Sequence, residues 1–184
     1  MKTRKFLSIA LFTVVLGASS FAQKTVMVGG AAMYPSKNIV ENAVNSKDHT
    51  TLVTAVSAAG LVETLKSKGP FTVFAPTNAA FDKLPAGTVT TLLKPENLKM
   101  LQTILTYHVV AGKMNASDIA KAIKKGNGKA TMKTVSGGTL TAWMQGKDLY
   151  ITDENMNKAK VTIADVNQSN GVIHVIDAVV LPKQ

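Results

Sequence analysis

The sequence predicts an α+β domain, and two observations support this prediction. Apolar residues at helical spacing lie mainly in the first half of the chain, whereas the second half holds short strand-like runs separated by turns about every ten residues. Helices that precede a series of strands favour an α+β fold over a doubly wound sheet, in which the two alternate. The length of 184 residues fits one domain, and the chain shows no repeat or internal linker.

Caps and apolar spacing justify the helical elements. Ser36 is expected to cap a first short helix, and Asp48 a second one that ends at Gly60. Thr77 or Asn78 caps a short helix after Pro76, because the proline closes the preceding strand. The expected helical segments are 37–44, 49–59, 61–65, 78–84, 88–94, 95–106 and 115–125.

β-branched and aromatic runs between turn residues justify the strands. The expected strands are 71–75, 107–110, 131–135, 140–144, 149–152, 161–166 and 172–181. Only short turns rich in Gly, Asn or Asp separate the last five, so we predict that they form an antiparallel meander.

The amino terminus predicts export. Lys2, Arg4 and Lys5 precede an apolar run and a small-residue cleavage site, so residues 1–22 are interpreted as a signal peptide cleaved near Ala22. Residues 23–36 are expected to form a leader segment outside the core, and residues 37–182 the domain. The mature protein is expected in the periplasm or outside the cell, with no transmembrane segment, and without cysteine it relies on its core alone.

The net charge of +10 does not predict a nucleic-acid partner. Three of the positive charges lie in the signal peptide, which leaves +7 for the mature chain, and the only arginine is among those removed. The remaining lysines are scattered, and lysine lacks the planar fork with which arginine grips phosphate and guanine. A basic exported protein is the simpler interpretation.

The sequence offers no positive argument for an enzyme, a metal site or a cofactor. Its three histidines, His49, His108 and His174, have no metal-ligand spacing. The chain has no nucleophile elbow, phosphate loop or dinucleotide fingerprint. The run from Asp153 to Asn157 begins like a calcium loop but lacks the glycine and the glutamate at its later positions, so a polar turn is expected.

Trp143 and Tyr150 face each other across a predicted hairpin. They are expected to pack against each other in the core, and the alternative is a stacking platform for a sugar or a base.

Three segments resemble the fasciclin domain, a secreted module of adhesion proteins. They are GPFTVFAPTNAAF at 69–81, TYHVV at 106–110 and NGVIHVIDAVVLP at 170–182. Their order and spacing agree with the family, and the similarity covers about residues 37 to 182. The resemblance implies a compact β-sandwich or wedge with the amino-terminal helices packed around it.

The residues of these motifs have an architectural interpretation. Phe74 and Phe81 are expected to fill the core, and Thr77 or Asn78 to cap the helix after Pro76. Alternation along the last strand is expected to let the strands of His108 and His174 share a buried polar network, with Asp177 at the strand end. Asn78 stands where the family usually has an acidic residue.

The resemblance implies a binding function without catalysis. Family members act in cell adhesion and in contacts with matrix, partner proteins or glycans, and integrin contact in animal relatives is attributed to segments that match Tyr107, His108, Asp118 and Ile119 here. A structural role for the same residues is the competing interpretation. We therefore predict a secreted adhesion or matrix-associated domain whose partner is an extracellular or envelope protein or a glycan. The alternative is a polysaccharide or small-ligand binding protein with a groove near Trp143 and Tyr150.

Overall fold

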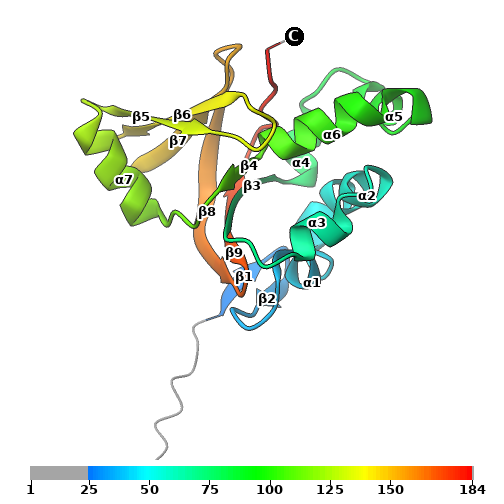
Figure 1. The fold of residues 1–184 in the computed structure, drawn as a ribbon, viewed down its shortest axis with the longest axis horizontal. Helices are drawn as coiled ribbons and strands as arrows, with labels where there is room; N and C mark the ends of the chain where they lie inside the picture. Colours follow the sequence, from blue (N-terminus) through cyan, green and yellow to red (C-terminus); the bar gives the residue numbers. More distant parts are fainter. Residues whose placement is uncertain (1–24, 184) are drawn as a thin grey trace, which may run out of the picture.

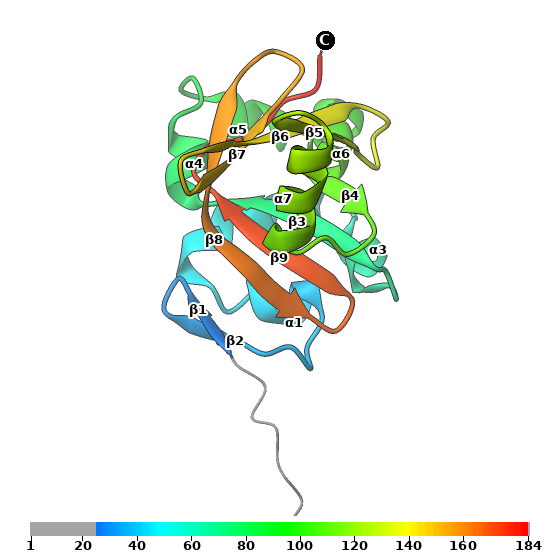
Figure 2. The same cartoon turned by 90° about the vertical axis from the view of Figure 1, so that its left-hand side faces the viewer.

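A computed structural model describes residues 25–183, so the expected signal peptide lies outside the described residues (Figures 1 and 2). The helices are α1 (Ile39–Ala43), α2 (Thr50–Ala58), α3 (Val62–Lys66), α4 (Asn78–Asp82), α5 (Thr88–Leu92), α6 (Leu98–Tyr107) and α7 (Ala116–Lys125). The strands are β1 (Val26–Val28), β2 (Ala31–Met33), β3 (Phe71–Pro76), β4 (Val109–Ala111), β5 (Lys129–Lys133), β6 (Thr139–Gln145), β7 (Asp148–Thr152), β8 (Lys158–Gln168) and β9 (Gly171–Ile176).

Seven strands form one mixed sheet in the order β4-β3-β9-β8-β7-β6-β5. The strands from β5 to β9 each pair antiparallel with the next, which confirms the predicted meander. β3 lies parallel to β9 along its whole length and antiparallel to β4. A bridge between Val110 on β4 and Thr134 just after β5 brings the two edges together, so the sheet is nearly closed. The α+β prediction is confirmed, with a wedge that approaches a barrel.

β8 is the strand that bends this sheet. One end pairs with β7 and the other with β9, and the register with β9 shifts on both sides of Ile163. Such irregularities increase the local bend and twist. Asp165, beside the second shift, has a φ of 59°, in the left-handed region that Asp tolerates better than most residues. Its carboxylate accepts a hydrogen bond of 2.6 Å from the Ala116 N–H at the start of α7, so the bend also positions that helix.

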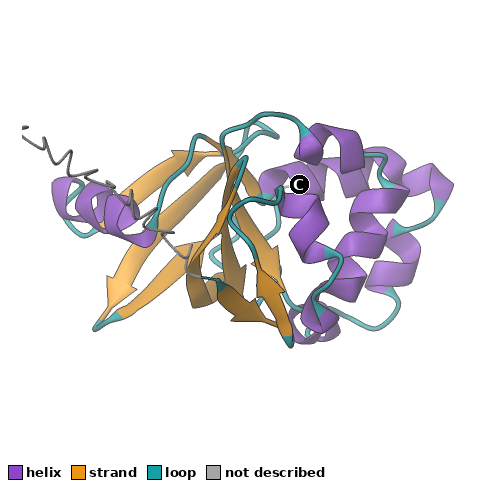
Figure 3. Ribbon diagram, turned by 90° about the horizontal axis from the view of Figure 1, so that it is seen from below, coloured by secondary structure: helices purple, strands orange, loops and turns teal. Residues whose placement is uncertain are grey.

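The helices lie on two sides of the strands (Figure 3). α7 packs against β5 and β6, and the helices from α1 to α6 form the group on the other side. α7 is amphipathic, with Ile119 and Ile123 buried at a spacing of four residues in one cluster with Leu140 and Ala142 of β6.

The amino-terminal hairpin of β1 and β2 corrects the prediction for residues 23–36. These residues do not stay outside the core, because Val28 and Met33 are only 4% and 3% exposed and belong to the cluster around β3 and β9. The buried Asn42 of α1 holds the end of the hairpin, since it accepts from the N–H of Tyr34 at 3.0 Å and donates to its carbonyl at 2.8 Å. Strands of three residues are too short to show a period in the sequence.

Two predicted strands are wrong at their ends. Tyr107 is the last residue of α6 and His108 its C-cap, so the β-forming run is divided between a helix and β4. Packing of the tyrosine ring in the core overrides the weak strand propensity of these residues. β9 ends at Ile176 and does not continue to Leu181, whose N–H donates to the carboxylate of Asp153 at 2.9 Å instead of to a strand.

Candidate functional site

The motif at residues 69–81 builds the junction between β3 and α4. Phe74 is fully buried, and its ring stacks on that of His174 with centroids 5.6 Å apart. Pro76 is the buried last residue of β3 and pairs with Ile176 of β9. Phe81 is only partly buried, because the short helix α4 turns instead the small Ala80 fully inward. The prediction that Phe81 fills the core is therefore wrong.

The sequence left open whether Thr77 or Asn78 caps the helix after Pro76, and in the structure the two residues have different roles. Thr77 is the N-cap of α4, and its hydroxyl accepts from the Ala80 N–H at 3.2 Å. Asn78 reaches the start of α2 instead, where its Oδ1 accepts from the Thr51 N–H at 3.0 Å and its Nδ2 donates to the Lys47 carbonyl at 2.9 Å. An amide supplies both a donor and an acceptor here, which a carboxylate does not.

His108 is a buried neutral imidazole whose two nitrogens both have backbone partners. The Val180 N–H donates to its Nε2 at 3.3 Å, so the proton lies on Nδ1, which donates to the Ile104 carbonyl at 2.8 Å. Burial lowers the pKa of His108 to about 4. The ring joins the end of α6 to the segment after β9 and has no free nitrogen for a substrate.

His174 has the same kind of environment at a separate place. Its Nδ1 accepts from the Asp165 N–H at 3.4 Å and its Nε2 donates to the Met114 carbonyl at 2.9 Å, while burial lowers its pKa. β3 lies between β4 and β9, and the two imidazoles bond to different backbone groups. The expected network shared by His108 and His174 is therefore wrong, and the six residues of β9 are all buried rather than alternating.

Asp177 and Tyr107 connect neighbouring segments of the fold through hydrogen bonds to the backbone. The Asp177 carboxylate accepts from the Lys160 N–H at 2.8 Å at the start of β8. The Tyr107 hydroxyl donates to the Thr139 carbonyl at 2.6 Å and accepts from the Glu154 N–H at 3.2 Å. Burial raises the pKa of Tyr107 to about 12, so this hydroxyl stays protonated at neutral pH.

The four residues that match the integrin-contact segments of animal relatives differ in how deeply they are buried. Tyr107 and Ile119 are fully buried and His108 is 3% exposed, so the folded surface does not present these three side chains to a partner. Only Asp118 is partly exposed, and its carboxylate accepts from the Asn115 N–H at 3.1 Å at the start of α7. The structure thus assigns the three buried residues to the core.

Trp143 and Tyr150 form a stacked pair on the outer face of the sheet (strands labelled in Figure 1). Their ring centroids lie 4.9 Å apart with the planes at 20°, so the two rings pack across the strands as predicted. The predicted core position of the pair is wrong, because neither ring belongs to a buried cluster. Both rings are partly exposed, whereas Ala142, Leu149 and Ile151 point to the opposite face and are buried. Lys129 and Lys160 continue this row on β5 and β8, and the Lys158 ammonium lies 5.2 Å from the Trp143 ring centroid.

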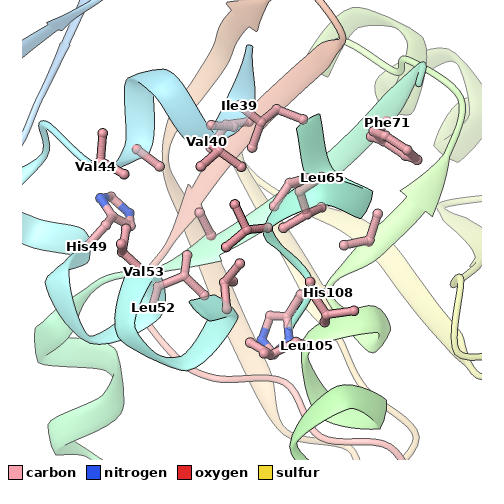
Figure 4. A pocket seen from close by; sticks show the side chains of 18 of the residues that line it. Ile39, Val40, Val44, His49, Leu52, Val53, Leu65, Phe71, Leu105 and His108 are labelled. Carbon is pink, nitrogen blue, oxygen red and sulfur yellow. The ribbon is translucent and has the colours of Figure 1, made fainter. Parts of the chain in front are cut away.

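An apolar cavity of about 390 Å³ lies between the helices and the sheet. Its volume falls within the range of roughly 300–1,000 Å³ found for small-molecule sites. One wall is formed by β3 and β9, and the opposite wall by α1, α2 and α3 (Figure 4). The lining is mainly apolar, with Ile39, Val53, Leu65, Val73, Leu105 and Ile173 among its members. Its polar and charged members are Glu41, Ser46, His49, Ser57, Thr64, Lys66, Thr106 and His108.

The cavity explains an irregularity in the burial of the helices. Leu52 and Val53 face inward, as their spacing predicts, yet both are only partly buried, and α3 contains no buried residue. The buried apolar residues on this side therefore form two clusters, one on the sheet and one on the helices. Leu52 and Leu65 lie between the two clusters and contact both. Apolar spacing reveals which residues point inward but not the distance to the wall they face.

His49 is one of several polar residues in this lining, and unlike Glu41, Thr64 and Lys66 it is buried. It is 3% exposed, and its Nδ1 lies 2.9 Å from the hydroxyl of Ser46. Within residues 25–183 its Nε2 has no hydrogen-bond partner, although a buried polar atom normally has one. Burial lowers the pKa of His49, so the ring is neutral at pH 7. Its ring lies beside Val44 and Val53 (Figure 4).

The described residues contain no group of three or more His, Cys, Asp or Glu side chains able to hold a metal ion. Asp153, which the sequence placed in a polar turn, is buried and closes that turn by accepting from the N–H groups of Asn155 and Asn157, each at 2.9 Å. Between residues 25 and 183, no helix is both long and apolar enough to span a bilayer.

Comparison with known proteins agrees with this geometry. The model of the fasciclin domain family matches residues 47–182. The chain belongs to the fasciclin domain family. In fold, it resembles a structure described as a FAS1 domain pair from the insect cell adhesion molecule Fasciclin I, with a TM-score of 0.69 at 19% identity, over 79% of this chain and 51% of that one.

Relatives of this fasciclin domain occur in bacteria. Protein sll1483 of Synechocystis sp. is 45% identical over 95% of this chain and 90% of its own length. The immunogenic protein MPB70 of Mycobacterium bovis is 38% identical over 76% of this chain and 66% of its own length. The cell surface glycolipoprotein MPB83 of Mycobacterium bovis is 36% identical over 88% of this chain and 68% of its own length.

Proposed function

We propose that this fasciclin domain is secreted after removal of residues 1–22 and acts, without catalysis, in cell adhesion or in association with the extracellular matrix. The outer face of the sheet around Trp143 and Tyr150 is the contact surface, and the exposure of this stacked pair is the observation that carries the proposal. Partly exposed aromatic rings supply large, stiff contact areas, and such residues are enriched where proteins bind their partners. The cell-surface location stated for MPB83 supports the same placement for its relative here.

The non-catalytic part of the proposal rests on how the titratable groups are used. His108 and His174 bond to backbone through both ring nitrogens, and the Tyr107 hydroxyl has two backbone partners. A general base needs a free lone pair within reach of a substrate proton, and these groups have none.

A polysaccharide is the second candidate partner, and the lysines of the outer face favour it. Lys129 lies in register with Trp143, and the Lys158 ammonium lies over the Trp143 ring. The Lys160 ammonium, in register with Tyr150, is already paired with the Asp148 carboxylate at 2.7 Å. Aromatic rings stack on sugar rings, and ammonium groups attract carboxylates or sulfates. An acidic glycan matches this combination better than a neutral one.

Retention of the purified mature chain on envelope and matrix fractions and on a glycan array tests both candidates. Trp143→Ala is expected to lower retention at least tenfold. Tyr34→Ala is the matched control, because Tyr34 is also an exposed aromatic ring, 46% accessible, with Lys37 at 5.3 Å. Tyr34→Ala is expected to retain the wild-type level.

The outcomes separate the parts of the proposal. Binding to a protein fraction alone supports the first candidate, and binding to acidic glycans supports the second. Equal retention of wild type and Trp143→Ala would remove the outer face from the proposal. Turnover of a substrate that depends on His108 without loss of thermal stability in His108→Ala would refute the non-catalytic function. Intact mass of the exported protein, expected to begin at Gln23, checks the cleavage.

A further inference from the structure

We infer that the cavity between the sheet and α1–α3 binds one hydrocarbon chain that ends in a single polar group, as in a fatty acid or one acyl chain of a lipid. This site lies among the helices, apart from the outer face around Trp143, and does not depend on the proposed adhesion function. The inference rests on the cavity's lining and shape, on the partial exposure of its helical wall, and on the free nitrogen of His49.

The lining selects for a long apolar ligand. Aliphatic side chains from β3, β9 and three helices surround about 390 Å³ of space that runs from His49 and Val44 towards Leu105 and His108 (Figure 4). A ligand with several polar groups would leave them without partners in this lining, which is unfavourable. A flexible hydrocarbon chain carries no such groups and follows an irregular elongated space.

The helical wall has surface left to bury. Leu52, Val53, Leu61, Val62 and Leu65 all line the cavity, and each is only partly buried. Burial of apolar surface is the main favourable contribution when an apolar ligand binds. The rim also holds Val44, which is 54% exposed, so an apolar approach to the cavity reaches the surface.

His49 positions the polar end. Ser46 occupies Nδ1, while Nε2 is buried and has no well-aligned hydrogen-bond partner in residues 25–183, although the ring lies near the backbone of Ala75. The ring itself lies in the lining beside Val44 and Val53 (Figure 4). A carboxyl or hydroxyl oxygen of a ligand supplies that partner. His108, at the other end, has both nitrogens bonded to backbone and recognises nothing further. The remaining polar side chains of the lining, Glu41, Ser57, Thr64, Lys66 and Thr106, are exposed or partly exposed. His49 is thus the buried group that orients the ligand, with the polar end of the ligand beside it.

Parinaric acid, an 18-carbon fatty acid that fluoresces in apolar sites, is the first probe. The mature wild-type chain is expected to raise its fluorescence saturably, at about one probe per chain, and palmitic acid to compete. Val53→Trp fills the cavity and is expected to weaken binding at least tenfold. Ala58→Trp adds the same side chain to the exposed face of α2 and is the matched control, expected to bind as the wild type does.

A second pair of measurements tests His49. His49→Phe keeps a ring of similar size and is expected to weaken parinaric acid at least fivefold while leaving diphenylhexatriene, a probe without a polar group, unchanged. Equal effects on both probes would refute the positioning role of His49. Methyl NMR provides a readout that needs no variant: the signal of Met33, which lines the cavity, is expected to shift with the ligand, and that of Met156, 73% exposed, is not.

Mass spectrometry of an organic extract of the protein, purified from its own cells, identifies the source of the bound hydrocarbon chain. Free fatty acid and phospholipid differ in mass and are distinguished in this way. Either identification supports the inference. Absence of saturable fluorescence together with an unmoved Met33 signal would overturn it, and so would equal loss of binding in Val53→Trp and Ala58→Trp, because the probe would then be on the surface. Trp143→Ala is expected to bind the probe normally, which keeps this result separate from the adhesion test.

Discussion

Acid is expected to destabilise this protein through His108 well above the pH at which carboxylates protonate. The folded chain holds the imidazole neutral between the Ile104 carbonyl and the Val180 N–H, with its pKa lowered to about 4 by burial. In the unfolded chain the pKa is about 6.5. The unfolded state therefore binds more protons between these values, so this stability is present above pH 6.5 and is lost as the pH falls towards 4.

The size of the effect follows from the two pKa values. A folded pKa of about 4 and an unfolded value of about 6.5 give a loss of about 2 kcal/mol from His108 between pH 7 and pH 5. His174 and His49 add to this loss, because burial lowers the pKa of each. Domains of this size are stable by about 5–15 kcal/mol, so the loss is a large share of the total.

The assay is urea unfolding at pH 7 and pH 5 for the wild type and His108→Gln. The amide of glutamine keeps one donor and one acceptor but does not titrate. The variant is expected to lose about 2 kcal/mol less than the wild type between the two pH values. Gln145→His is the control, since position 145 is exposed and an imidazole there titrates alike in both states.

Two results would refute this reasoning. One is a His108 pKa near 6.5 in an NMR titration of the folded protein. The other is an equal change in stability for wild type and His108→Gln. Either would mean that the folded state accommodates a charged imidazole at this position, in contradiction to its burial.

Two further substitutions test the core at places where sequence reasoning was incomplete. Tyr107→Phe leaves the Thr139 carbonyl and the Glu154 N–H without their shared partner, so denaturant unfolding is expected to show a loss of about 1–3 kcal/mol. Tyr150→Phe on the outer face is expected to change stability by less than about 0.5 kcal/mol, and equal losses would contradict the core role of Tyr107. Met33→Ala is expected to cost about 2–5 kcal/mol in the same assay, because it empties part of the hairpin's core contact. Met27→Ala, on the same hairpin but 59% exposed, is its control, and a small effect of both would place the hairpin outside the cooperative unit.

Local patterns were sufficient for the order of elements and for the meander. The run from Phe71 to Ala75 identified a buried strand, apolar spacing identified α7, and turns rich in Gly or Asn identified the hairpins between β5 and β9. The expected caps at Ser36 and Asp48 are wrong, because α1 is capped by Asn38 and the N-cap of α2 is His49. The sequence also predicted that Trp143 and Tyr150 lie opposite each other, because the turn of a tight hairpin sets the register of its strands.

The sequence by itself determined the helix-then-strand order, the buried strands and the family motifs, because spacing and turn chemistry are properties of neighbouring residues. Only the tertiary structure decided the parallel pairing of β3 with β9, the place of the β1–β2 hairpin in the core, and the burial of Tyr107 and Ile119. The presence of the cavity also depends on the tertiary structure. Leu52 and Leu65 have the same inward-facing spacing in the sequence whether the sheet contacts them or lies farther away and leaves a cavity. Pairing between distant strands and the gap between layers depend on how the whole chain packs, which no local pattern encodes.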